Sequence, residues 1–332
     1  MYLWAEDWGH ISSLDLIHWR HHHDAIGGSN GDKGCFSGGA FVDDDGTAYI
    51  TYWITDGPRG IGIAKSSDRH YDKWTKSLKN PIIKSTEYGI TETTDANGNF
   101  LVYGSADPSN IWKQNGVYYF VTGNVMVLDK FGRALDSPEE MKGDWVDLFR
   151  SENLEDWEYV HRFYERSDEW THVSEDNMCP SFLPLPSSPG GCEPSSKHLL
   201  LFLSHNRGAH YYVGEYRDNK FFHENHGRFS WKDSMFYAPE AMVDGKGRQI
   251  AWSWLVDSME SLDPEWTRTR GWSGVYSLPR SLWLGEDSTL RMRPVEELKA
   301  LRCNRNIGVI SRLVGMDQEG WPGLWATPAT WR

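Results

Sequence analysis

Several features that would narrow the function of this chain at once are missing from its sequence. No apolar window of about 18 residues occurs among its 332 residues, which excludes a membrane-spanning helix. Basic residues are scarce, with 34 Lys and Arg against 47 Asp and Glu, and the formal net charge is −13. Since nucleic acid binding requires a basic face, we expect neither nucleic acid nor membrane as a partner.

Cysteine is also rare, and its spacing matches no metal or redox template. We expect reduced, structural thiols at the four positions Cys35, Cys179, Cys192 and Cys303. His21, His22 and His23 are consecutive, so their side chains point in different directions, and we predict no metal site there. The sequence predicts no cofactor. No signal peptide follows Met1, which indicates a cytoplasmic protein if Met1 is the true start.

Long helical periodicity is nearly absent, and the best candidate covers only residues 295–301. Short strand patterns with intervening turns dominate instead. Residues 41–42 and 47–53 flank an Asp-Gly turn, and Asn115-Gly116 separates two further strand patterns. Other predicted strands cover residues 199–204, 210–216 and 250–255, while residues 84–99 and 184–197 are expected to be surface loops. These strand and turn patterns predict an all-β fold.

A short motif recurs along the chain. Residues 13–19 and 151–157 share the pattern Ser-x-Asp/Asn-Leu-x-x-Trp, and residues 64–74 contain a looser copy. Each copy predicts a strand that enters a polar turn closed by Trp. Repeated motifs in an all-β chain are typical of the blades of a propeller.

Aromatic residues are abundant, with 18 Trp, 15 Tyr and 13 Phe. Aromatic faces stack on the C–H faces of sugar rings, but strands also use aromatic side chains in their cores. Composition alone therefore leaves a carbohydrate ligand and an aromatic core equally open.

Several short sequence blocks stand in a fixed order along residues 1–302. The first runs from Trp8-Gly9-His10 to His18-Trp19. The later blocks are Phe36-Ser37-Gly38, Asp107-Pro108, Cys179-Pro180, Phe236-Tyr237-Ala238-Pro239, Gly271-Trp272-Ser273-Gly274 and Pro294-Val295-Glu296-Glu297-Leu298. In sequence and in order, these blocks resemble those of glycoside hydrolase family 32, the β-fructosidases.

The resemblance implies a five-bladed β-propeller over residues 1–302, whose first blade is incomplete. Residues 303–332 would form an irregular tail or the truncated start of a lost β-sandwich, so we expect no C-terminal sandwich. It also implies a funnel-shaped pocket that cleaves β-fructofuranosides such as sucrose, inulin or levan. Retaining cleavage uses an Asp nucleophile and a carboxylic acid about 5 Å apart.

The sequence departs from the family at both catalytic positions. The family nucleophile lies in an N-D-P-N-G-like segment upstream of Trp8, and none of the seven residues before Trp8 forms that segment. A truncated gene model and a true loss both explain this. The family Glu before Cys-Pro is Met178 here, and a thioether cannot donate a proton. We predict that a local bulge brings Glu175 into the donor position, with Asp176 as a second choice.

The remaining predicted site residues are assigned from the resemblance. Asp107 should bind furanose hydroxyls and stabilise the transition state, although the preceding family Arg is Ala106 here. We expect the sugar to be contacted by Trp8, His10, Phe36, Ser37, Asp176 and Glu240, with Glu240 on the leaving-group side.

A function of a different class also fits these departures. A catalytically inactive propeller that binds fructans or other sugars would explain the loss of the nucleophile, the donor and the Arg. A five-bladed hydrolase of arabinose polymers shares the Asp-Pro theme, but the blocks at Trp8 and Phe36 argue against it.

Overall fold

The computed structural model describes residues 8–28, 31–191, 193–230, 235–256 and 264–302. The contacts between these residues divide the chain into two compact units. The larger unit contains residues 8–12 and 19–295, and the smaller contains residues 13–18 and 296–302. The tail predicted at residues 303–332 lies outside the described residues, as do Cys192 and Cys303.

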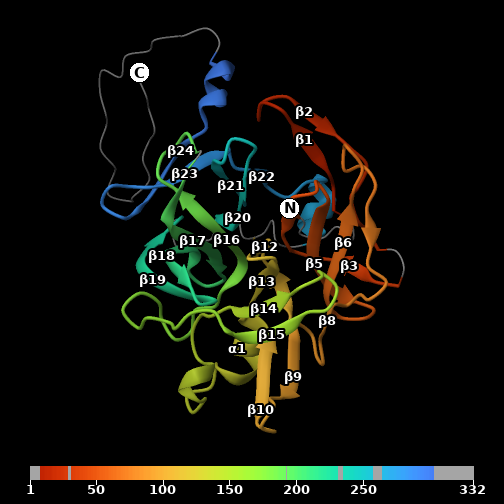
Figure 1. Ribbon diagram of the computed structural model, residues 1–332, viewed down its shortest axis with the longest axis vertical. Helices are drawn as coiled ribbons and strands as arrows, with labels where there is room; N and C mark the ends of the chain where they lie inside the picture. Colours follow the sequence, from red (N-terminus) through yellow and green to blue (C-terminus); the bar gives the residue numbers. More distant parts are fainter. Residues whose placement is uncertain (1–7, 29–30, 192, 231–234, 257–263, 303–332) are drawn as a thin grey trace. The chain divides into compact units, whose positions relative to one another are not determined.

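Four sheets make up most of the larger unit (Figure 1). Sheet I contains β3 (Lys33–Cys35), β4 (Ala40–Val42), β5 (Ala48–Asp56), β6 (Gly60–Ser66), β7 (Thr75–Lys76) and β8 (Ile83–Lys84). Sheet II contains β11 (Ala106–Pro108), β12 (Trp112–Gln114), β13 (Val117–Gly123), β14 (Asp147–Ser151) and β15 (Glu158–Arg162). Sheet III contains β16 (Met178–Pro186), β17 (Pro194–Ser204), β18 (Gly208–Arg217) and β19 (Lys220–Arg228). Sheet IV contains β20 (Phe236–Val243), β21 (Gln249–Leu255), β22 (Val275–Tyr276), β23 (Arg280–Leu284) and β24 (Leu290–Pro294).

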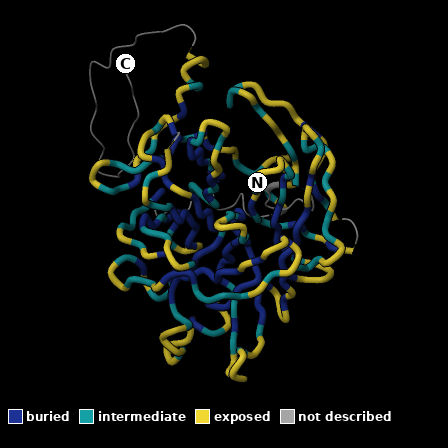
Figure 2. Tube along the Cα trace, in the orientation of Figure 1, coloured by how far each residue is buried: buried dark blue, intermediate teal, exposed yellow. Residues whose placement is uncertain are grey.

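Two smaller antiparallel pairs accompany the sheets. They are β1 (Ile11–Ser13) with β2 (Trp19–His21), and β9 (Ile90–Thr94) with β10 (Phe100–Gly104). The tip of the second pair is exposed, as Figure 2 shows. Residues 84–99 are therefore not one surface loop, as the sequence suggested, because β9 occupies residues 90–94.

Every sheet is an antiparallel meander that begins at its inner strand. In sheets II, III and IV the edge strands β11, β16 and β20 come first in the chain, and the later strands follow outward. β11 contacts β5 and β6 of sheet I, β16 contacts β11 and β13, and β20 contacts β16 and β17. Consecutive sheets thus pack beside one another in a propeller-like, all-β arrangement, as the repeated motifs predicted.

Both faces of a middle sheet are buried, which explains its long apolar run. In β17, Leu200 and Phe202 pack into a cluster with sheet II, while Leu199 and Leu201 pack into a cluster with sheet IV. Side chains alternate between the two faces of a strand, so a strand that is covered on both faces has apolar side chains at successive positions. The predicted loop at residues 184–197 is shorter than expected, because β16 extends to Pro186 and β17 begins at Pro194.

The recurring motif forms the same turn at two places. Asp15 Oδ1 accepts hydrogen bonds from the backbone of Ile17 and His18, and Asn153 Oδ1 accepts them from Glu155 and Asp156. The leucine that follows has a positive φ in both turns, 59° at Leu16 and 65° at Leu154. The second turn joins β14 to β15, the two outer strands of sheet II, and the looser copy joins β6 to β7 in sheet I.

Helices are few and short in the described part of the chain. The larger unit has α1 (Val125–Phe131), the 3-10 turn η1 (Glu139–Met141) and α2 (Pro264–Arg270). The smaller unit has the 3-10 helix η3 (Glu296–Leu301), which replaces the predicted α-helical turns at residues 295–301. None of the helices described has the length and apolarity to span a membrane.

Candidate functional site

A cavity of about 400 Å3 lies among the inner strands of the four sheets. Its walls are largely aromatic, and they include Trp8, Phe36, Trp53, Tyr237, Trp252, Trp254 and Tyr276. Its polar groups are Ser37, Asp107, Cys179, His205, Glu240 and Ser253. An aromatic cavity with a few converging polar groups is suited to bind a small polar ligand.

The inner strands of three sheets bend at the cavity in the same way. The ladder registers shift between Ala106 and Pro108, between Met178 and Ser181, and between Tyr237 and Glu240. At each shift one residue has a positive φ: 43° at Asp107, 48° at Cys179 and 43° at Ala238. Each of these residues precedes a proline, namely Pro108, Pro180 and Pro239. Proline cannot donate a ladder hydrogen bond, so it marks a bulge, and a bulge re-aims the side chain beside it.

Asp107 is the carboxylate on the sheet II wall of the cavity. It is 5% exposed, and its Oδ2 accepts a hydrogen bond from Cys179 Sγ at 3.3 Å. Burial raises the pKa of Asp107, while bonds from Cys179 and Ser37 and the nearby His205 lower it in part. Trp8 is fixed beside it, because its indole N–H contacts the carbonyls of Cys35 and Phe36 at 3.1 Å.

Glu240 is the second carboxyl on the cavity wall, on β20. Ser181 Oγ donates a hydrogen bond to Glu240 Oε2 at 2.5 Å, and the same hydroxyl accepts one from the backbone of Ala241. Burial, together with the nearby charge of Asp107, raises the pKa of Glu240 to about 8. A carboxyl of this kind holds its proton at neutral pH.

His205 brings an imidazole to the same cavity, and sequence reasoning did not identify it. Its Nδ1 lies 2.6 Å from Asp176 Oδ2, and its backbone N–H donates to Asp176 Oδ1. Burial lowers the pKa of His205, but the bond and charge of Asp176 outweigh it, so the net shift is upward. Asp176 is fully buried and does not line the cavity, so it positions His205 rather than contacting a ligand there.

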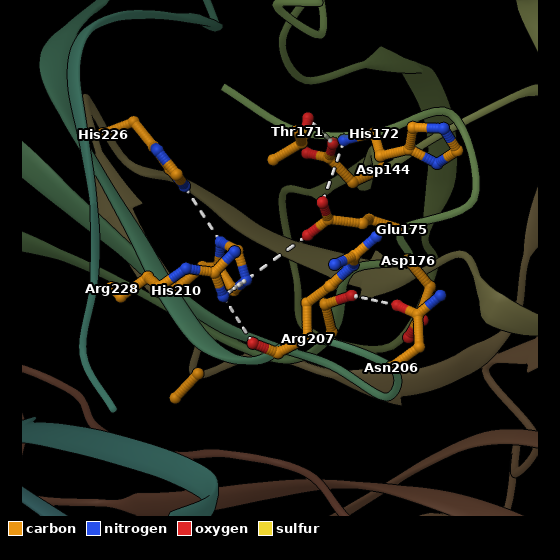
Figure 3. Close-up of polar contacts among 12 residues, drawn as sticks. Asp144, Thr171, His172, Glu175, Asp176, Asn206, Arg207, His210, His226 and Arg228 are labelled. Atoms are coloured by element: carbon orange, nitrogen blue, oxygen red, sulfur yellow. Dashed lines mark hydrogen bonds and ion pairs between the residues drawn. The ribbon is translucent and has the colours of Figure 1, made fainter. Parts of the chain in front are cut away.

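Glu175 does not line the cavity, contrary to the expected bulge at that residue. The bulge lies at Cys179, and Glu175 points to a different cluster (Figure 3). Its Oε1 accepts the backbone N–H of His172 at 2.9 Å, and its Oε2 lies 3.4 Å from His210 Nε2. Met178, at the family donor position, does line the cavity.

His10 also lies apart from the cavity lining. It stacks on His22 with ring centroids 4.1 Å apart, and His22 bonds Ser12 and Asp72 through its two nitrogens. His10, His22 and Asp72 offer ligand atoms within 4.8 Å of one another. Both nitrogens of His22 are already hydrogen-bonded, so this geometry gives no support for a metal ion. His21 and His23 are exposed while His22 is buried, as expected for consecutive residues.

Of the predicted site residues, the structure brings Trp8, Phe36, Ser37, Asp107 and Glu240 to one cavity. It places His10, Glu175 and Asp176 outside the lining. Sequence reasoning missed His205 and the aromatic residues of sheet IV. The recurrence of a proline after a cavity residue in Asp107-Pro108, Cys179-Pro180 and Ala238-Pro239 is the signal that could have located the walls.

Several known proteins are similar to this chain in sequence and in fold. The chain is 29% identical over 345 residues to beta-fructofuranosidase, insoluble isoenzyme 3, of Oryza sativa subsp. indica, covering 93% of this chain and 53% of that protein. It is 29% identical over 313 residues to raffinose invertase of Escherichia coli, covering 89% of this chain and 57% of that protein. The chain thus spans about half the length of the curated relatives it matches.

The fold is similar to that of the crystal structure of fructan 1-exohydrolase IIa from Cichorium intybus. The TM-score is 0.66 at 24% identity, and the match covers 90% of this chain and 54% of that one. The sequence model described as "Glycosyl hydrolases family 32 N-terminal domain" matches residues 3–294. The chain therefore belongs to glycoside hydrolase family 32.

Proposed function

We propose that this chain forms the fructosyl-binding part of a β-fructofuranoside hydrolase. The observation that carries the proposal is the buried Asp107 carboxylate, which lies in an aromatic cavity together with Ser37 and Trp8. A buried carboxylate binds sugar hydroxyls strongly, because hydrogen bonds to a charged acceptor are stronger than neutral ones. The names of the relatives, among them a beta-fructofuranosidase and a fructan 1-exohydrolase, support fructosides as the substrate class.

Hydrolysis with retention would proceed through two carboxyl groups. The nucleophile would attack the anomeric carbon of the fructosyl unit while an acid protonates the leaving oxygen. The family nucleophile precedes the Trp8-Gly9-His10 block, and we assign that role to no residue of this chain. Asp107 would stabilise the positive charge that develops on the furanose ring.

A sugar-binding propeller without catalysis is the second candidate function. Met178 favours it, since a thioether stands on the cavity wall at the position of the family acid. The two functions share the binding site, so only turnover distinguishes them.

The test measures binding and turnover separately. Calorimetry with fructose, sucrose and a fructan, alongside Asp107→Asn, reports binding. Release of fructose from sucrose and inulin reports turnover, with the protein extended upstream of Met1 wherever the gene encodes further residues. Binding with turnover supports the hydrolase, and binding without turnover supports the second function. If no fructoside binds, both are contradicted.

We also propose that β1 and β2 are strands of a fifth blade. Their connecting turn has the same hydrogen bonds and the same positive-φ leucine as the turn between the two outer strands of sheet II. The Trp8 backbone additionally forms a bridge with Ile26. An experimental structure of the protein tests this: β1 and β2 should be the outer strands of a four-stranded sheet.

A further inference from the structure

One carboxyl group of the cavity is better placed to donate a proton than Met178, the residue at the family position. Met178 on β16 cannot donate a proton, and Glu175 lies in another cluster. On the next sheet, Glu240 follows the bulge at Ala238, and that bulge brings the start of β20 to the cavity.

We propose that Glu240 is the acid/base group of this chain, so that the proton donor has moved from the inner strand of sheet III to the inner strand of sheet IV. This inference rests on the proposed hydrolase function. Ser181 of β16 links the two strands, because its hydroxyl donates to Glu240 Oε2 at 2.5 Å. Glu240 therefore stands beside the strand that carries the donor in the family pattern.

The groups around Glu240 fit this role. Asp107 on β11 lines the same cavity and its negative charge favours the protonated form, while Ser181 on β16 stabilises the carboxylate. The Cys179 thiol on β16 interacts with both carboxyls. Two carboxyl groups in one cavity with different roles are a common arrangement in glycosidases: one stays ionised and the other keeps its proton.

The other titratable groups on the cavity wall are less suited. Asp107 is engaged by Cys179 and Ser37 and is assigned to the fructosyl unit. His205 is held by Asp176 through two hydrogen bonds, and the one at its ring Nδ1 stabilises the cationic form. Hydrogen bonding to a buried carboxylate makes the imidazolium a weaker acid. A protonated Glu240 carries no charge, and the carboxylate that it leaves accepts the hydrogen bond from Ser181.

The step balances with water as the co-reactant. The nucleophile carboxylate bonds to the fructosyl anomeric carbon while the Glu240 proton passes to the glycosidic oxygen. The bond from that oxygen to the anomeric carbon breaks, and its electron pair remains on the released alcohol. Water then adds to the anomeric carbon, the bond to the nucleophile breaks with its electron pair returning to that carboxylate, and one water proton returns to the Glu240 carboxylate. The net change is fructoside plus water to fructose plus alcohol.

The decisive experiment compares substrates that need protonation with one that does not. Glu240→Gln should reduce kcat on sucrose by about 10²- to 10⁴-fold, the range typical of general acid catalysis. It should reduce kcat much less on a nitrophenyl β-fructofuranoside, whose leaving group departs unprotonated. Glu215→Gln, at a half-buried position on β18 paired with Lys197, is the matched control and should behave as wild type.

Two further measurements separate catalysis from structure. Fructose should bind Glu240→Gln within a few-fold of wild type, and the alkaline limb of the wild-type pH profile should vanish in the variant. Full sucrose activity of Glu240→Gln overturns the inference, and so does an equal loss on both substrates. A selective loss in Glu175→Gln or His205→Asn, with Glu240→Gln active, also overturns it. A wild-type protein that neither binds nor cleaves fructosides contradicts the proposed function itself.

Discussion

Asp107 combines an unusual backbone conformation with a buried charge. Its φ of 43° lies in the left-handed region, which Asn and Asp adopt more readily than other residues with a side chain. Its carboxylate is bonded by Cys179 and exposed by only 5%. The backbone at this position and the ligand-binding group therefore depend on the same residue.

Replacing Asp107 by Asn should separate the two roles. Asn keeps the conformation but removes the negative charge, and losing a charged hydrogen bond costs about 1.5–3 kcal/mol. We expect fructose to bind about 10- to 100-fold more weakly by calorimetry, with the melting temperature close to wild type. Asp107→Ala should lose binding and also stability, because Ala at a positive φ adds about 1–2 kcal/mol of strain. Equal fructose affinity in wild type and Asp107→Asn would remove Asp107 from the ligand site.

Three residues that the sequence assigned to the site line the cavity, and all three lie inside short family blocks: Phe36, Ser37 and Asp107. Glu175 does not reach the cavity because it precedes β16 and is held at His172. Its Oε1 accepts the backbone N–H of His172, and its own backbone N–H donates to the His172 carbonyl. His205 was missed because its role depends on Asp176, a partner 29 residues away.

At the scale of a strand, the bulges of β11, β16 and β20 explain why the cavity forms at all. Each interrupts the ladder at the cavity and lets the residue before the proline turn inward. The sequence contains this signal as X-Pro pairs, but an isolated X-Pro pair is common in turns and gains its meaning only from the repetition. Strand positions, by contrast, follow directly from turn residues: Asn115 and Gly116, with φ of 52° and 80°, join β12 to β13 as predicted.

Ala238 offers a direct test of the bulge in β20. Gly tolerates a positive φ, so Ala238→Gly should keep Glu240 in place and change the free energy of unfolding by no more than about 1 kcal/mol. Val is β-branched and strained at a positive φ, so Ala238→Val should destabilise by about 1–3 kcal/mol and lower sucrose turnover. Urea unfolding and kinetics measure both variants. If Val behaves like Gly in both assays, the bulge does not control the site.

The histidines of sheet III should make that sheet sensitive to acid. Arg228 donates to His210 Nε2 and His226 Nε2 lies 2.9 Å from His210 Nδ1, so His210 is neutral and donates from Nδ1. Burial is the main cause that lowers the pKa of His210 to about 3 and of His226 to about 4. The unfolded chain takes up these protons near pH 6.5. The neutral histidines therefore make their full contribution to the free energy of unfolding above that pH, and this contribution is lost as the pH drops toward 4.

His226→Gln tests this directly, since the Gln oxygen can still accept the His210 hydrogen bond. Between pH 4 and 7 the free energy of unfolding should depend less steeply on pH in the variant. The change in slope should correspond to at most one proton fewer taken up on unfolding. His23→Gln, at an exposed histidine outside sheet III, is the control. An identical slope in wild type and His226→Gln would show that His226 titrates normally in the folded protein.

Across the whole molecule, the abundant aromatic residues occupy two kinds of site. Phe120, Phe149, Phe182 and Phe202 are fully buried between sheets, whereas Trp8, Trp252 and Tyr276 line the cavity. Composition could not separate these uses, because the same side chains serve a strand core and a sugar-binding wall. The fold class was nevertheless accessible, because the repeated turns and the ordered family blocks extend along most of the chain.

Glu240 connects the cavity to the stability of the whole molecule. Its pKa of about 8 in the folded protein exceeds the ordinary value of 4.5, so between these pH values the folded state holds a proton that the unfolded state has lost. The contribution of this group to the free energy of unfolding is therefore at its maximum below about pH 4.5 and declines as the pH rises to 8.

Glu240→Gln removes the titration, so the stability of the variant relative to wild type should increase with pH across this window. The slope is at most about 1.4 kcal/mol per pH unit, and water at the half-buried carboxyl reduces it. Urea unfolding of both proteins from pH 5 to 8.5 measures the difference, and a constant difference over that range would show that Glu240 is ionised at neutral pH.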